Sequence, residues 1–138
     1  MHYTDLDVWQ QAVDLTIEVY AATSRLPREE RFGLTAQMRG AAVSVASNIA
    51  EGEGRRWRRD HARFVLQARG SLFELHTQIL ICERLVYFDC DTAAGLTHRI
   101  ARVGQLINGT LRYLSQAANR EPRTAPRSPS PAPLPRTT

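Results

Sequence analysis

Apolar residues recur at helical spacing along most of the chain. Between residues 32 and 59 the spacing alternates between four and three residues, the pattern of a helix packed in a bundle. The positions on this stripe are Leu34, Met38, Ala42, Val45 and Ile49. Comparable stripes cover about residues 5–24, 58–87 and 91–118. No segment alternates like a strand, so the pattern predicts an all-α fold.

The segments between these stripes are short and contain helix-ending residues. Pro27 stops the first helix, and we expect Gly52 and Gly54 to end the central one, because glycine accepts the left-handed conformation of a helix C terminus. Four helices with short connections predict an antiparallel up-down-up-down four-helix bundle. The expected N-terminal caps are Thr4 or Asp5 for the first helix and Asp91 or Thr92 for the fourth.

The central helix carries a second stripe of small and polar residues. Two interpretations fit it: a solvent-exposed face, or a face covered by another helix or another subunit. Small side chains favour the covered face, because exposed faces usually carry longer charged residues. A polar strip on the third helix is a natural neighbour, and we expect a hydrogen bond between Glu74 and Asn48. The candidate structural or interface residues are Gln37, Ser44, Asn48, Glu51, Gly52 and Glu74.

The third helix is expected to bury one stripe that ends at Val86. Gly70 lies in the middle of this helix, where glycine costs about 1 kcal/mol relative to alanine. We therefore expect a neighbouring helix to approach closely at Gly70.

A cluster of arginines around one tryptophan follows the central helix. Its members are Arg55, Arg56, Trp57, Arg58, Arg59 and Arg63. Guanidinium groups beside an aromatic ring can bind phosphates and stack on bases, which makes the cluster a candidate nucleic-acid site. The alternative is a solvated turn whose arginines pair with Glu51, Glu53 and Asp60 while the indole packs under a helix. The neighbouring glycines follow a helix and no lysine is present, so a phosphate-binding loop is excluded.

The end of the chain differs from the rest in composition. Six of the seven prolines lie in residues 119–138, which have little apolar bulk, so we expect a disordered tail there and a single folded domain over residues 1–118. The tail holds four of the 18 arginines and one of the 14 acidic residues, which leaves the body a net charge of only +1. A nucleic-acid surface on the body must therefore come from local clustering.

Candidate chemistry is sparse. The four histidines form no metal-binding motif, the two cysteines have no metal spacing, and no nucleophile motif occurs. We expect no catalytic residue, cofactor or metal; a small enzyme using Glu51, Glu74 or His61 is a third hypothesis. The start of the chain lacks signal-peptide character and no apolar run is long enough to span a membrane, so we expect a cytoplasmic protein with no membrane partner.

The segment FGLTAQMRGAAVSVASNIAEGEGR, residues 32–55, resembles the signature of the 23S rRNA-intervening-sequence protein family. The opening D-V-W-Q-x-A and the ARGSLFEL of residues 68–75 resemble it too, and the resemblance covers about residues 3–116. The family's name records genes found inside rRNA insertions. Gly40 stands where the family usually has arginine, which removes a basic side chain, and Ala46 where it usually has proline.

The resemblance implies a four-helix bundle that assembles as a homo-oligomeric ring, commonly a pentamer. Together with the arginine cluster it predicts a non-enzymatic oligomer that binds RNA or DNA. The alternative is a protein–protein interaction scaffold with an unidentified protein partner and no nucleic-acid role.

Overall fold

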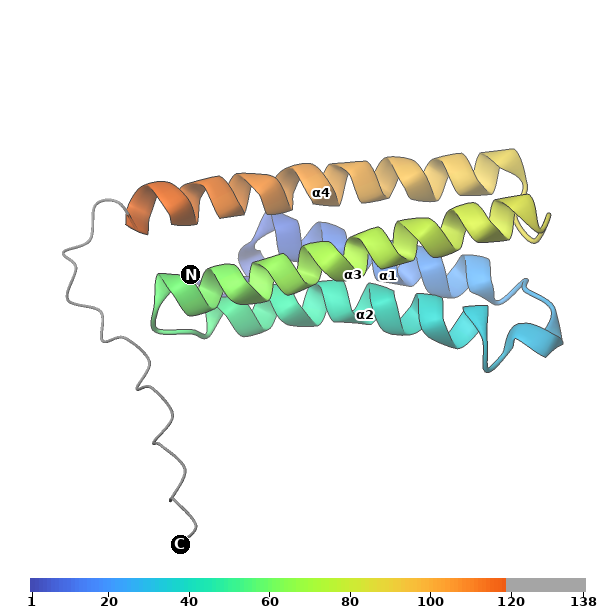
Figure 1. Cartoon of the computed structure of the whole chain (residues 1–138), viewed down its shortest axis with the longest axis horizontal. Coiled ribbons are helices and arrows are strands. Elements are labelled where there is room, and N and C mark those ends of the chain that lie inside the picture. The colour runs from blue at the N-terminus through green and yellow to red at the C-terminus, as the bar shows by residue number, and fades with distance from the viewer. Residues whose placement is uncertain (119–138) are drawn as a thin grey trace, which may run out of the picture.

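The computed structural model describes residues 1–118, and four long helices run antiparallel along one axis (Figure 1). The elements are η1 (Tyr3–Asp5), α1 (Asp7–Thr23), η2 (Arg28–Glu30), α2 (Leu34–Glu53), α3 (Arg58–Arg84) and α4 (Cys90–Ala118). The predicted all-α, up-down-up-down bundle is confirmed. The expected disordered tail, residues 119–138, lies outside the described part of the chain. Within residues 1–118, no helix is long and apolar enough to cross a membrane.

The predicted apolar stripes form the core. Contacts run from α1 to α2 and α4, and from α3 to the same two helices. Fully buried side chains from all four helices include Leu15, Val19, Met38, Val45, Leu72, Leu75, Ile79, Val103 and Ile107. Val86 is an exception to the prediction: α3 ends at Arg84, so Val86 lies in the following turn and is exposed.

The contact between α2 and α3 is polar in its middle. The hydroxyl oxygens of Ser44 and Ser71 lie 2.8 Å apart, and Asn48 Nδ2 donates to the Ser44 carbonyl at 2.8 Å. The predicted bond between Glu74 and Asn48 is wrong, because Glu74 instead accepts from Gln78 Nε2 at 3.3 Å. Ser71, which lies one turn before Glu74 on α3, contacts α2 at this level in place of Glu74.

The second stripe of the central helix is therefore covered by the chain's own α3 over part of its length. Ala41 is buried and Ser44 and Asn48 are half-buried, whereas Gln37 and Glu51 are exposed. Neither sequence interpretation holds for the whole stripe.

The central helix ends at Glu53 with Gly54 as its C-cap residue, so the expected helix end is confirmed at Gly54, whereas Gly52 lies inside the last turn. No glycine among residues 1–118 has a positive φ. A Cβ on Gly52 would lie 2.9 Å from Cδ2 of His61, 3.2 Å from its carbonyl oxygen and 3.3 Å from Cβ of Phe64. Gly52 is thus needed because the start of α3 crosses close above it.

The helix caps also differ from expectation. Thr4 and Asp5 lie in η1, and the N-cap residue of α1 is Leu6, which makes no side-chain cap. At the start of α4, the backbone N–H of Thr92 donates to Asp89 Oδ1 at 2.7 Å. The helix begins at Cys90, earlier than expected, so Asp89 is the capping residue.

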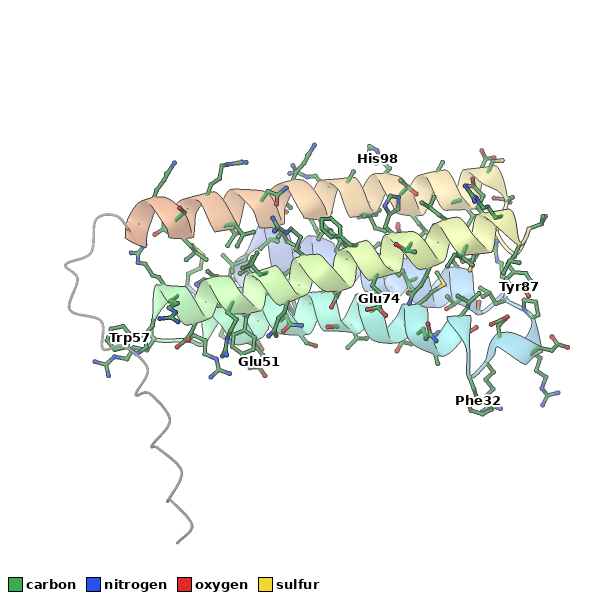
Figure 2. All side chains as sticks on the ribbon, viewed as in Figure 1. Phe32, Glu51, Trp57, Glu74, Tyr87 and His98 are labelled. Atoms are coloured by element: carbon green, nitrogen blue, oxygen red, sulfur yellow. The ribbon has the colours of Figure 1, made fainter. Side chains whose placement is uncertain are left out.

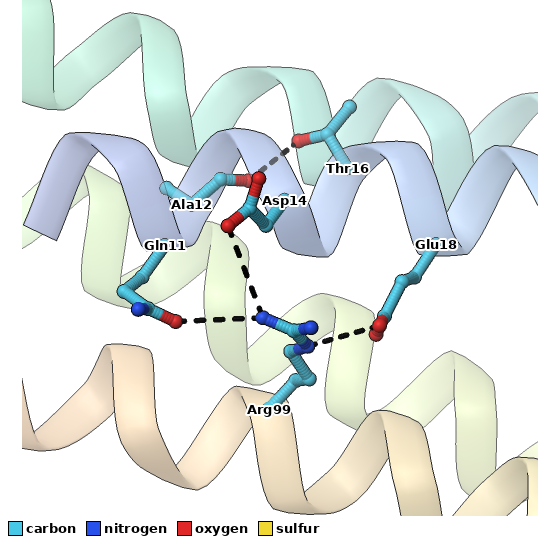
Figure 3. Close-up of polar contacts among 6 residues, drawn as sticks. All are labelled: Gln11, Ala12, Asp14, Thr16, Glu18 and Arg99. Atoms are coloured by element: carbon cyan, nitrogen blue, oxygen red, sulfur yellow. Dashed lines mark hydrogen bonds and ion pairs between the residues drawn. The ribbon is translucent and has the colours of Figure 1, made fainter. Parts of the chain in front are cut away.

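An arginine on α4 ties this helix to α1 (Figure 3). Arg99 Nε donates to Glu18 Oε1 at 3.0 Å and Nη1 donates to Gln11 Oε1 at 3.5 Å, with Asp14 Oδ2 4.0 Å away. No local pattern predicts this cluster, because its partners are more than 80 residues apart in the sequence.

Candidate nucleic-acid interface

The predicted arginine cluster lies at the end of the bundle where α2 turns into α3. The C terminus of α4 lies at the same end (Figure 1). Trp57, the residue before α3, projects outward there (Figure 2) and keeps 40 % of its surface exposed. It is therefore not packed under a helix as the alternative interpretation required.

Two arginines of the cluster lie against the ring of Phe64. The guanidinium carbon of Arg55 lies 4.4 Å from the ring centroid and that of Arg63 lies 5.2 Å from it. Arg55 also pairs with Glu51, one turn earlier on α2, at 2.9 Å. This ion pair at i,i+4 is exposed and contributes well under about 1 kcal/mol.

Arg58 points away from the rest of the cluster. It is half-buried, lies 5.7 Å from the ring of Tyr113 on α4, and lines a cavity of about 870 Å³. His61 also lines this cavity, and its Nε2 lies 3.2 Å from Glu53 Oε1. Sequence reasoning missed the cavity because its walls come from segments far apart in the sequence, among them Leu6 near the start of the chain, His61 on α3 and Leu106 on α4.

Three arginines of the cluster, Arg63 among them, are open to solvent. Arg56, Arg59 and Arg63 are exposed, and none of them forms an ion pair with another residue of the range 1–118. Arg56 lies 5.0 Å from the ring centroid of Trp57. The alternative interpretation holds for one pair, because Glu51 binds Arg55 of the cluster. Glu53 differs from that interpretation: its Oε1 lies 3.2 Å from Nε2 of His61.

The three residues named for an enzyme do not converge. Glu51 pairs with Arg55, His61 with Glu53, and Glu74 with Gln78. Figure 2 places Glu51 near the Trp57 end and Glu74 near the middle of the bundle. In the described chain, no group of three His, Cys, Asp or Glu side chains is arranged to hold a metal ion.

Shifted pKa values occur at the opposite end of the bundle. Burial, together with the nearby charge of Glu30, raises the pKa of Cys82 to about 11. Burial and Glu30, which accepts from the phenol at 3.5 Å, also raise the pKa of Tyr87. The backbone N–H of Thr92 lowers the pKa of Asp89. These groups support the turn between α3 and α4 and lie away from the arginine cluster.

Comparison with known proteins agrees with this fold. No curated protein sequence matches the chain. A crystal structure of a protein of unknown function from the S23 ribosomal protein family of Bacteroides thetaiotaomicron is similar, with a TM-score of 0.71 at 16 % identity over 75 % of this chain and 97 % of that chain. The model of the 23S rRNA-intervening sequence protein family matches residues 4–109. The chain therefore belongs to the 23S rRNA-intervening sequence protein family.

Proposed function

We propose that the protein is a non-enzymatic, cytoplasmic homo-oligomer, expected to be a pentameric ring, that binds single-stranded nucleic acid through the turn between α2 and α3. The observation that carries the proposal is the exposure of Arg56, Arg59 and Arg63, which form no ion pair within residues 1–118, together with the exposed indole of Trp57. The guanidinium carbon of Arg56 lies 5.0 Å from the centroid of that indole. Free guanidinium groups bind phosphates, and an exposed indole stacks on an unpaired base.

The body of the protein carries a net charge of only +1, so a single site would bind weakly. A ring repeats the cluster around its axis and converts several weak contacts into one stronger interaction. Assembly and binding therefore support each other.

The proposal is tested by fluorescence anisotropy of the full chain with labelled single-stranded RNA and DNA over a range of salt concentrations. The triple variant Arg56→Gln, Arg59→Gln, Arg63→Gln removes about three phosphate contacts, so the slope of log K against log salt should fall by about 2. Trp57→Ala should weaken binding by about tenfold or more at all salt concentrations.

The matched control is Arg25→Gln, Arg28→Gln, Arg84→Gln, which changes the same charge on exposed residues at the opposite end. All variants keep the four arginines of residues 119–138. The proposal predicts near wild-type binding for the control. Equal losses in both triple variants, or no binding by the wild type, would overturn it.

A second candidate function is a protein-interaction scaffold without nucleic acid. It is favoured by the large apolar side chains that α3 exposes on its outer face. An oligomer that binds neither RNA nor DNA in the same assay, and loses a co-purifying protein when residues 119–138 are removed, would support this alternative.

A further inference from the structure

The outer face of α3 carries an apolar stripe that its own bundle does not cover. Leu66, Gly70, Phe73, Thr77 and Leu80 follow each other at spacings of four and three residues. They lie ~150° around the helix from the core positions, at 100° per residue. Phe73 is 62 % exposed, and Leu66 and Leu80 are nearly half exposed. The spacing is that of a helix packed against another, but residues 1–118 supply no helix on this side.

A second surface, formed by α1, α2 and the residues just before α2, is hollow. A groove of about 520 Å³ runs along it, and its lining includes Tyr20, Phe32, Ala36, Arg39, Gly40 and Val43. Arg39 forms one wall, held by a bond from its Nε to Thr23 Oγ1 at 2.9 Å and by stacking on Tyr20 at 4.5 Å.

A glycine lies in the middle of each surface, and no neighbour among residues 1–118 explains it. A Cβ on Gly40 or on Gly70 would meet no atom of residues 1–118 within 4 Å. Each glycine costs about 1 kcal/mol of helix stability relative to alanine. The sequence-based explanation for Gly70, a close neighbouring helix, therefore fails within one subunit. Close approach by another molecule explains both positions.

We propose that the α3 stripe (Leu66, Gly70, Phe73, Thr77, Leu80) of one chain docks into the α1–α2 groove of a second copy of the same chain. Large side chains protrude from the stripe, and Ala36 and Gly40 leave room for them in the groove, so the two shapes complement each other. The charges agree as well: the groove lining includes Arg31 and Arg39 and no carboxylate, whereas the exposed Glu74 follows Phe73 directly.

This contact joins two different surfaces, so each chain offers one stripe and one groove. Such a head-to-tail contact closes into a ring when the rotation between neighbours allows it. A two-fold contact between two α3 stripes would account for Gly70 but would leave Gly40 and the groove empty. The inference rests on the homo-oligomer of the proposed function and assigns its interface.

Light scattering after size-exclusion chromatography tests the assignment with two variants. Phe73→Arg places a charged side chain on the stripe, and Val43→Arg places one in the groove, so each should block its surface from docking. Both native side chains are exposed, so the bundle itself should stay folded. Each variant alone should have the mass of a single chain. Tyr113→Arg, an equally exposed aromatic on α4, is the matched control and should keep the wild-type mass.

An equimolar mixture of the two variants gives the sharper result. The intact stripe of the Val43→Arg chain should dock into the intact groove of the Phe73→Arg chain. The substituted groove and stripe should prevent further chains from binding, so assembly should stop at a dimer. A Cys90→Ser background that carries Phe73→Cys and Val43→Cys traps a weak contact by oxidation and should yield a ladder of cross-linked chains. The single Phe73→Cys variant should not cross-link.

The outcomes separate the two proposals. A wild-type chain of single-chain mass overturns the oligomer and the interface together. A wild-type oligomer that is unaffected by Val43→Arg, or a Phe73→Cys chain that cross-links alone, overturns the interface and leaves the oligomer standing.

Discussion

The backbone N–H of Tyr87 donates to the carbonyl oxygen of Cys82 at 2.8 Å and closes the end of α3. The N–H of Val86 donates to Glu83 at 3.0 Å inside the same turn. This double closure requires a residue in the left-handed conformation, and Val86 takes that role with a φ of 62°. A β-branched residue is poorly suited to this conformation, so the turn is strained.

Replacement of Val86 by glycine should relieve this strain. We expect Val86→Gly to raise the free energy of unfolding by about 1 kcal/mol, the order of the left-handed penalty for a residue with a Cβ. The side chain is 84 % exposed, so little packing is lost. Urea unfolding followed by circular dichroism measures the change. Val86→Ala, which keeps a Cβ, should gain less; an equal gain in both variants would contradict a conformational cause.

Two glycines on different helices should respond to alanine with opposite signs. Gly52→Ala places a Cβ 2.9 Å from His61 and close to its backbone, so we expect a loss of about 1–3 kcal/mol by overpacking. The Cβ of Gly95→Ala meets no atom of the described residues within 4 Å, so this variant should gain about 0.5–1 kcal/mol of helix stability. Thermal unfolding of both variants checks the pair. A neutral Gly52→Ala variant would mean that α3 does not cross close to α2 at this point.

Stability should fall in alkaline solution because of Cys82. Its thiol is fully buried and has a pKa of about 11 in the folded chain, against an ordinary value of 9.0. Above pH 9 the unfolded chain loses this proton first, so the free energy of unfolding should decrease between about pH 9 and 11, by at most about 3 kcal/mol. Below pH 9 the stabilising contribution is fully present.

Cys82→Ala is the control for this pH dependence. It should lower stability at every pH, because the buried sulfur near Met38 is lost, but it should flatten the decline between pH 9 and 11. Guanidinium unfolding curves at several pH values give both quantities. An unchanged decline in the variant would assign it to other groups, of which Tyr87, with its raised pKa, is the first candidate.

The hydrophobic pattern alone was enough to predict the four helices and the buried side of each. The four-three spacing marks which residues of one helix share a face, and Leu72, Leu75 and Ile79 lie in the core as expected. The spacing contains no information on how far one helix slides along its neighbour. For this reason Ser71 meets Ser44 where Glu74 was expected to meet Asn48.

The candidate site was predicted in composition but not in geometry. A run of arginines in a turn gives no direction to each side chain, and only the path of α4 turns Arg58 toward Tyr113 while Arg56 and Arg59 stay in solvent. The sequence identifies Gly52 as a position that needs glycine, but it indicates the backbone conformation as the reason. The actual reason is the close approach of α3. The sequence alone does not reveal which element passes above a residue.

With the proposed contact between chains, the exposed α3 stripe would make the behaviour of the chain depend on its concentration. A subunit released alone from the ribosome holds Phe73 and its two leucine neighbours in water, and chaperones and proteases recognise such surfaces. If the α3 stripe is the proposed contact between chains, synthesis beyond the supply of partners would lead to turnover or precipitation of the surplus. The working level of the protein in a cell would thus be set by how quickly each new chain finds its partner.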